Sequence, residues 1–218
     1  MNREWSDKNK LAQGKLKKAT FYDGINEFLK LREMLMQEML SWKKFLSSDD
    51  YCAIPFINAD GYHSKTVAYS IWHIIRIEDI VVNSLIRRKK EVLYENNFDK
   101  KIGADIITTG NELVKQEIAE FSKKLNIEAL YEYALSVKVS TDEWLKSIHY
   151  EDIKKKFGDD DKKRISELGV VSDDESAVWL IDYWCNKDIS GLIKMPLSRH
   201  WIMHIEAANR IKEKLLDK

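Results

Sequence analysis

One helical stripe near residue 200 constrains the fold of this sequence more strongly than any other feature. Within residues 196–211, inward positions recur at steps of three and four residues, which is the spacing of one face of an α-helix. A helix with this pattern buries the repeated face, so its members are predicted to point into a core. They are Leu197, His200, His204, Ala207, Ile211 and, just beyond, Leu215.

The two histidines of this stripe, His200 and His204, lie four residues apart. Side chains at this spacing on a helix are neighbours, with Cβ atoms about 5–6 Å apart, which suits two imidazoles that bind one metal ion. The pattern also fits two core histidines whose ring nitrogens are hydrogen-bonded. A third ligand from another helix would favour the metal, because a catalytic zinc site usually has three protein ligands and one open position.

The candidate third ligand is His73, in the middle of a helix predicted over residues 64–90. It lies on the apolar side of that helix, where a single core histidine would give the same pattern. With His200 and His204 it predicts an open three-histidine site. Neutral imidazole binds zinc, nickel, copper and iron, so the ligands alone do not choose the metal. The open position would hold either water made acidic by the metal or an incoming thiol held as thiolate.

Apolar periodicity predicts further helices over residues 23–46, 104–124 and 126–148. Another is predicted to begin at the capping box formed by Ser172 and Glu175, a serine with an acid three residues later. Strand-like alternation is almost absent, and the chain contains only 2 prolines and 8 glycines, which favours long helices. The sequence therefore predicts an all-α fold, a bundle of four core helices with extra helical segments.

The domain organisation is predicted to be simple. Residues 1–18 are polar and basic and are expected to form a mobile N-terminal arm. Residues 19–218 are expected to form a single helical domain, which is long enough to bury a core. The charged stretch 150–172 is predicted to be a surface insertion, and Gly191 to end the helix that the capping box begins.

Charge and cysteine content limit the classes of partner. The chain has 36 basic and 36 acidic residues, so it has no overall positive field for nucleic acid. No run approaches the roughly 18 apolar residues of a membrane span, and the polar first ten residues contain no apolar signal core. Cys52 and Cys185 form no disulfide framework. We therefore expect a cytoplasmic protein that acts on a small-molecule substrate, without nucleic-acid or membrane partners.

Other catalytic motifs fit less well. A zinc protease of the His-Glu-x-x-His type needs glutamate directly after the first histidine, whereas this chain has Trp201 there. A di-iron carboxylate bundle needs Glu-x-x-His pairs, and none of the five histidines has one. No glycine-rich phosphate loop is present. A cysteine nucleophile built on Cys52 or Cys185 stays open, although buried inert thiols are commoner.

Two segments, WHIIRIEDI from Trp72 and SRHWIMHIEAANRI from Ser198, resemble the DinB/YfiT-like superfamily of four-helix-bundle metalloenzymes. That family has one histidine in the second core helix and a His-x-x-x-His pair in the last, which match His73, His200 and His204. The resemblance spans residues 23–216. It implies a four-helix bundle with a long crossover, a divalent metal and frequently a homodimer. Nickel or zinc is the favoured metal, with iron or manganese as further options.

Characterised relatives of that family include transferases and isomerases that use a low-molecular-weight thiol such as bacillithiol, mycothiol or glutathione. The expected function is therefore metal-dependent transfer of such a thiol to a small electrophile, in detoxification or stress. Glu78, Glu206 and Tyr183 are candidate polar neighbours of the metal. Two alternatives stay open: a hydrolase that uses metal-bound water, and a non-enzymatic helical protein whose metal or histidines are structural.

Overall fold

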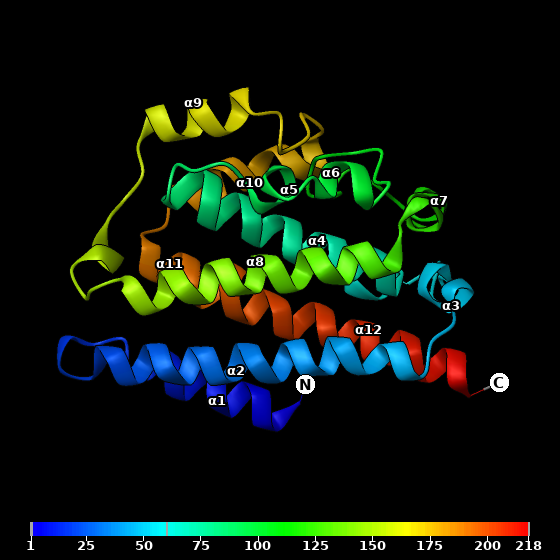
Figure 1. Ribbon diagram of the computed structural model, residues 1–218, viewed down its shortest axis with the longest axis horizontal. Helices are drawn as coiled ribbons and strands as arrows, with labels where there is room; N and C mark the ends of the chain where they lie inside the picture. Colours follow the sequence, from blue (N-terminus) through cyan, green and yellow to red (C-terminus); the bar gives the residue numbers. More distant parts are fainter. Residues whose placement is uncertain (1, 60, 218) are drawn as a thin grey trace.

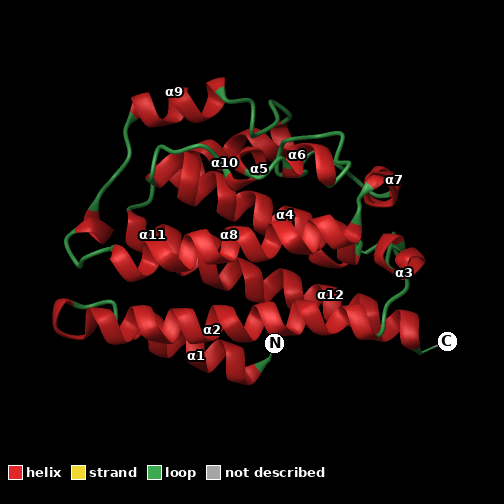
Figure 2. Ribbon diagram, in the orientation of Figure 1, coloured by secondary structure: helices red, strands yellow, loops and turns green. Residues whose placement is uncertain are grey.

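The computed structural model describes residues 2–59 and 61–217, and their regular elements are all helical (Figures 1 and 2). The predicted all-α fold is confirmed for these residues, which form no strand beyond an isolated bridge between Lys156 and Asp188. Met1, Asp60 and Lys218 belong to the predicted arm and domain but lie outside the described residues.

Four long helices form the bundle, and each of the first two contacts both of the last two. In Figure 1 the second and third run in the same direction, so the chain between them has to cross back along the bundle. This is the long crossover that was expected. The four helices are α2 (Phe21–Ser41), α4 (Val67–Asp79), α8 (Ile127–Ser147) and α12 (His200–Leu216).

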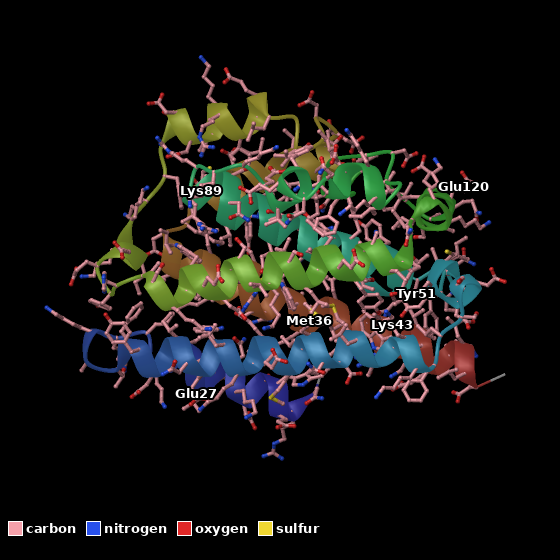
Figure 3. The ribbon with its side chains drawn as sticks, in the orientation of Figure 1. Glu27, Met36, Lys43, Tyr51, Lys89 and Glu120 are labelled. Carbon is pink, nitrogen blue, oxygen red and sulfur yellow. The ribbon has the colours of Figure 1, made fainter. Side chains whose placement is uncertain are left out.

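The core lies between these four helices. Leu35, Trp72, Tyr133 and Trp201, one from each helix, belong to the same buried cluster. Figure 3 shows Met36 between α2 and the helices above it, whereas Glu120 points away from the molecule. Burial follows the predicted stripes because each helix turns its apolar face toward the other three.

The helix α4 is buried on every side, since each of its residues from Val67 to Asp79 is buried. It continues into a π-helical turn, Ile80–Ile86. Its ionised side chains have buried partners: Arg76 pairs with Glu91 at 2.7 Å, and the Asp79 carboxylate accepts from the Tyr133 hydroxyl at 2.8 Å. A helix that is buried all round can carry charge only where each charge is paired.

The crossover contains two short helices, α5 (Val92–Glu95) and α6 (Phe98–Lys101), then an irregular segment, 102–115, and α7 (Gln116–Lys124). The prediction of a helix over 104–124 is therefore wrong in its first half. Gly103 and Gly110 have φ of 76° and 78°, a left-handed conformation that interrupts a right-handed helix.

The connection from α8 to α12 is also helical. It contains α9 (Asp159–Glu167), α10 (Glu175–Cys185) and α11 (Ile189–Lys194), followed by a π-helical turn, Met195–Arg199, that leads into α12. The predicted surface insertion thus includes a helix that buries Ile165. Shorter elements complete the chain: α3 (Ser48–Cys52) and the 3-10 turns Lys18–Thr20, Trp42–Lys44, Gly61–His63 and Asp152–Lys154.

Two predicted helix ends near α10 are wrong. The cap of α10 is Asp174, whose carboxylate accepts the Ser176 N–H at 2.8 Å, and not Ser172. Gly191 lies inside α11, where its N–H donates to the Asp188 carboxylate at 2.7 Å. Asp174 and Asp188 are the N-caps of α10 and α11, and α10 already ends at Cys185, before Gly191 is reached.

The predicted mobile arm is wrong as well. Residues Arg3–Gly14 form helix α1, which packs along α2. Trp5, Asn9 and Ala12 are buried on one face of it. Their spacing is helical, but the many lysines between them hide the pattern in the composition. None of the helices in residues 2–59 and 61–217 is long and apolar enough to cross a bilayer.

Candidate metal centre

The three histidines predicted as ligands meet in the core. His73 lies in the middle of α4, and His200 and His204 lie in the first two turns of α12. One ring nitrogen of each lies within 4.8 Å of the corresponding nitrogens of the other two. All three side chains are buried. The contact between α4 and α12 therefore joins residues that are far apart in sequence.

The spacing of two of the ring nitrogens matches a shared metal ion. The Nε2 atoms of His73 and His200 are 3.2 Å apart. Two nitrogens that bind one tetrahedral zinc at about 2.0–2.1 Å lie roughly 3.3 Å from each other. In metal-free protein the same distance allows a hydrogen bond between the two rings. The donor set, three imidazoles, suits zinc, nickel, iron and copper.

The orientation of His73 is fixed by a backbone carbonyl. Its Nδ1 lies 2.9 Å from the carbonyl oxygen of Thr109. Because a carbonyl oxygen only accepts, Nδ1 carries the proton and donates it. The lone pair is then on Nε2, which faces His200. A ligating histidine is usually held by such a bond from its other nitrogen, and this bond also fixes the tautomer.

The segment that supplies this carbonyl is held by α4 along its length. Tyr69, Trp72 and Arg76 donate to the carbonyls of Gly110, Thr108 and Ile107, at 2.9, 3.1 and 2.8 Å. With His73, four side chains of one helix bind four successive carbonyls. The apolar pattern predicted a helix here, in which those carbonyls would bind backbone N–H groups, so this arrangement was not expected.

Burial keeps the three imidazoles neutral. Desolvation lowers the pKa of His73 to about 4, against the weaker opposing effect of the Thr109 carbonyl. Desolvation and the neighbouring histidines lower the pKa of His200 and His204 well below their ordinary value. Neutral imidazole is the form that binds metal, so at neutral pH no proton has to leave these rings before an ion enters.

The histidines line a cavity of about 350 Å³. One wall is a stripe of Lys65, Tyr69, His73 and Ile77, which recur every four residues at the start of α4 and along it. An aromatic part of the lining comes from α10, with Trp179, Tyr183 and Trp184. No carboxylate lies among the described residues of the lining. The cavity thus combines aromatic side chains, hydrogen-bond donors such as Lys65, and a candidate metal position.

The three predicted polar neighbours differ in their positions. Tyr183 lines the cavity. Glu78 does not, because its carboxylate is buried against Arg32, with two hydrogen bonds of 2.7 and 2.8 Å. Glu206 also lies elsewhere and accepts from the backbone N–H of Asn2. The prediction that Glu78 and Glu206 adjoin the metal is therefore wrong, since each carboxylate is committed to a partner outside the cavity.

Neither cysteine takes part in the site. Both are free thiols. Cys52 borders a separate hollow of about 830 Å³ at the end of the bundle where Lys43 and Tyr51 lie (Figure 3). Burial raises its pKa, and burial together with acidic neighbours raises the pKa of Cys185 to about 11. Both thiols are therefore protonated at neutral pH, which gives no support to a cysteine nucleophile.

Lys65 and Asn111 also line the cavity and were missed in the sequence. The signal for Lys65 was available, because it lies eight residues before His73 and four before Tyr69, on the same helical face. Asn111 could not be predicted in the same way, because it belongs to the irregular segment 102–115, which has no helical face.

Comparisons with known proteins bear on the fold alone. No family model and no curated protein matches this chain. The fold is similar to the crystal structure of a conserved protein from Enterococcus faecalis, with a TM-score of 0.59 over 89% of this chain and 96% of that one. The two sequences are 15% identical, so the helical architecture is shared and nothing is implied about activity.

Proposed function

We propose that this protein is a divalent-metal-dependent enzyme that transfers a low-molecular-weight thiol to a small electrophile. The observation that carries the proposal is the meeting of three buried imidazoles, at nitrogen separations suited to one ion, on the wall of a cavity. The ion would be zinc or nickel, with iron or manganese as further options, and His73, His200 and His204 would hold it.

A divalent ion bound there would supply a Lewis-acidic position at which a thiol is held as its more reactive thiolate. All three proposed ligands are neutral, so the protein cancels none of the positive charge and favours an anion at the open position. His73 is kept in the ligating tautomer by the Thr109 carbonyl. The aromatic wall from α10 would pack against an apolar electrophile and exclude water from it.

The cavity also bears on the two alternatives. Zinc proteases use a carboxylate as general base for the attacking water, and the described lining residues include no carboxylate. A purely structural zinc site is closed by four protein ligands, whereas the described residues supply three and face a cavity. Thiol transfer therefore has the better support.

The resemblance to the DinB/YfiT-like superfamily remains part of this proposal. It is supported by the helix order, the long crossover and the positions of the three histidines on the second and last core helices. We propose on the same basis that the protein pairs as a homodimer. The free thiols Cys52 and Cys185 support a reducing, cytoplasmic compartment.

The first test is metal content, measured by mass spectrometry on untagged protein beside His73→Ala and His204→Ala variants. We expect near-stoichiometric metal in the wild type and loss of it in both variants. The matched control is His149→Ala, because His149 is exposed and contacts the Tyr22 hydroxyl away from the cavity. Protein that holds no metal and also refuses zinc, nickel, iron and manganese would overturn the proposal.

The second test addresses the thiol. Cobalt(II)-substituted protein is titrated with bacillithiol, mycothiol and glutathione, and the visible spectrum reports a new sulfur ligand. A thiolate charge-transfer band, followed by consumption of an alkyl halide or epoxide, is expected. Ester cleavage without added thiol would instead identify the hydrolase. A spectrum that no thiol or azide changes would indicate a closed, structural ion.

A further inference from the structure

Lys65 is a half-buried cation in the wall of the candidate site. It lies just before α4 and lines the same cavity as the three histidines. No ion pair or hydrogen bond joins its ammonium to a described residue, whereas the deeply buried cations Arg32 and Arg76 are each paired with carboxylates. Among the described residues, Lys65 is thus a cation of the protein interior that lacks an anion.

The position of the ammonium is defined by two rings. It lies over the face of Tyr69, 4.9 Å from the ring centroid. Tyr69 in turn stacks on His73, with centroids 5.5 Å apart and an interplanar angle of 12°. The ammonium is therefore no more than about 10 Å from the centre of the His73 ring. A small molecule that reaches the histidines with one end can reach Lys65 with the other.

The field of this cation is felt across the cavity. It contributes to lowering the pKa of both His73 and His204, and its own pKa is lowered by burial. Asn111, on the same lining, accepts from the Thr109 hydroxyl through its amide oxygen at 2.8 Å. Its amide N–H groups are not used by a described residue. The ammonium and the amide are both donors, and a carboxylate accepts from donors of either kind.

We propose that Lys65 is the carboxylate anchor of the cavity, so that the thiol taken by this site carries a carboxylate at the end away from its sulfur. This inference rests on the proposed function only for the binding of the sulfur at the metal. A phosphate is often bound bidentately by an arginine fork, and the described lining residues include no arginine. The aromatic wall would then contact the chain that joins the two ends.

The test compares a charged probe with its neutral twin. Zinc-loaded protein is titrated calorimetrically with mercaptohexanoic acid and with its primary amide, whose extended chains are comparable with the separation above. The wild type is expected to bind the acid about tenfold more tightly than the amide. Lys65→Met should abolish this preference and Lys65→Arg should keep it. The control is Lys123→Met, which alters an exposed lysine on the separate hollow and should change nothing.

Equal binding of acid and amide by the wild type would overturn the anchor without the need for any variant. A preference that survives in Lys65→Met, with the fold checked by circular dichroism, would overturn it too. A competition experiment with inorganic phosphate extends the test. Displacement of the acid by millimolar phosphate would show that the anchor binds phosphate and not a carboxylate.

Failure of the metal proposal can be told apart from failure of the anchor. Metal-free protein is titrated with hexanoic acid and hexanamide, which carry no thiol. If the protein refuses every metal but still prefers the acid through Lys65, the anchor stands and the proposed enzyme falls. If zinc and thiol bind but no acid preference exists in either experiment, the enzyme stands and the anchor falls.

Discussion

The guanidinium of Arg32 donates to the carbonyl of Leu197, three residues before His200, at a distance of 3.1 Å. The same guanidinium pairs with Glu78, five residues after His73, at 2.7 Å, and its carbon lies 4.9 Å from the centroid of the Trp201 ring. One fully buried side chain of α2 thus holds both helices that carry the histidines.

Replacement of Arg32 by methionine is expected to cost about 3–5 kcal/mol of folding free energy. The reason is that the Glu78 carboxylate would lose the guanidinium against which it is fully buried, whereas Asp142 would keep its ion pair with Lys138. Urea unfolding followed by circular dichroism measures the loss. Lys30→Met is the control, because Lys30 is exposed and its only ion pair with a described residue is to Glu27. A loss below about 1 kcal/mol would show that the pair contributes little beyond its own desolvation.

Zinc is expected to stabilise the folded wild-type protein and to leave the His73→Ala variant unchanged. A ligand that binds only the native state adds about 2.7 kcal/mol at a concentration of 100 times its Kd. Thermal unfolding of chelator-treated protein, with and without added zinc, reports this shift. An equal shift in wild type and variant would place the bound zinc elsewhere on the chain.

Metal-free protein is expected to lose stability as the pH falls from about 6.5 toward 4. An unfolded histidine takes up a proton below about 6.5. Folded His73, whose pKa burial lowers to about 4, does not take one up until the pH is far lower. The unfolded state therefore binds more protons in this window, and each such histidine removes about 1.4 kcal/mol per pH unit.

Urea midpoints measured between pH 7.5 and 4.5 test this slope. His204→Gln should make the slope shallower, because one of the three buried imidazoles is gone. His149→Gln is the matched control, because that ring is exposed and lies outside the cavity. A stability that is flat across the window would mean that the three rings are solvated and protonate in the folded state.

Gly110→Ala is expected to cost roughly 1–2 kcal/mol from the left-handed backbone alone. The residue has φ of 78°, and a Cβ there would lie 3.0 Å from Cε2 of Tyr69. Since the neighbouring Thr109 carbonyl orients His73, zinc affinity should fall as well. The control is Gly14→Ala in α1, where a Cβ meets nothing within 4 Å and the change should be neutral or mildly stabilising. Zinc competition with a chromogenic chelator measures the affinity, and an unaltered value would contradict the orienting role.

The all-α fold and the meeting of the three histidines could be anticipated because both depend on the helical periodicity of the buried residues. A stripe that repeats every three or four residues names the buried face of a helix, and residues on buried faces of packed helices meet. The helical pattern did not place Glu78 correctly. It lies on a buried helix, but α4 is buried on every side, so burial did not tell which side faces the cavity.

What the sequence did not predict depends on tertiary contacts. The segment 107–110 keeps its shape through bonds from α4 side chains, which no local pattern records. Helix α1 was not predicted for another reason. Its apolar face is narrow, and Trp5 and Ala12 are buried only because α2 lies beside them. Gly24 allows that approach, since a Cβ there would lie 3.0 Å from the backbone carbon of Lys15.

The wide separation of His73 and His200 along the chain has a consequence for synthesis. The two are 127 positions apart, so the pair is not assembled when α4 leaves the ribosome. A zinc finger gathers its ligands within one short segment and can fold around the ion. Here the bundle has to close first. An ion that binds at these histidines is therefore selected by a finished protein, from whatever metals its surroundings offer at that moment.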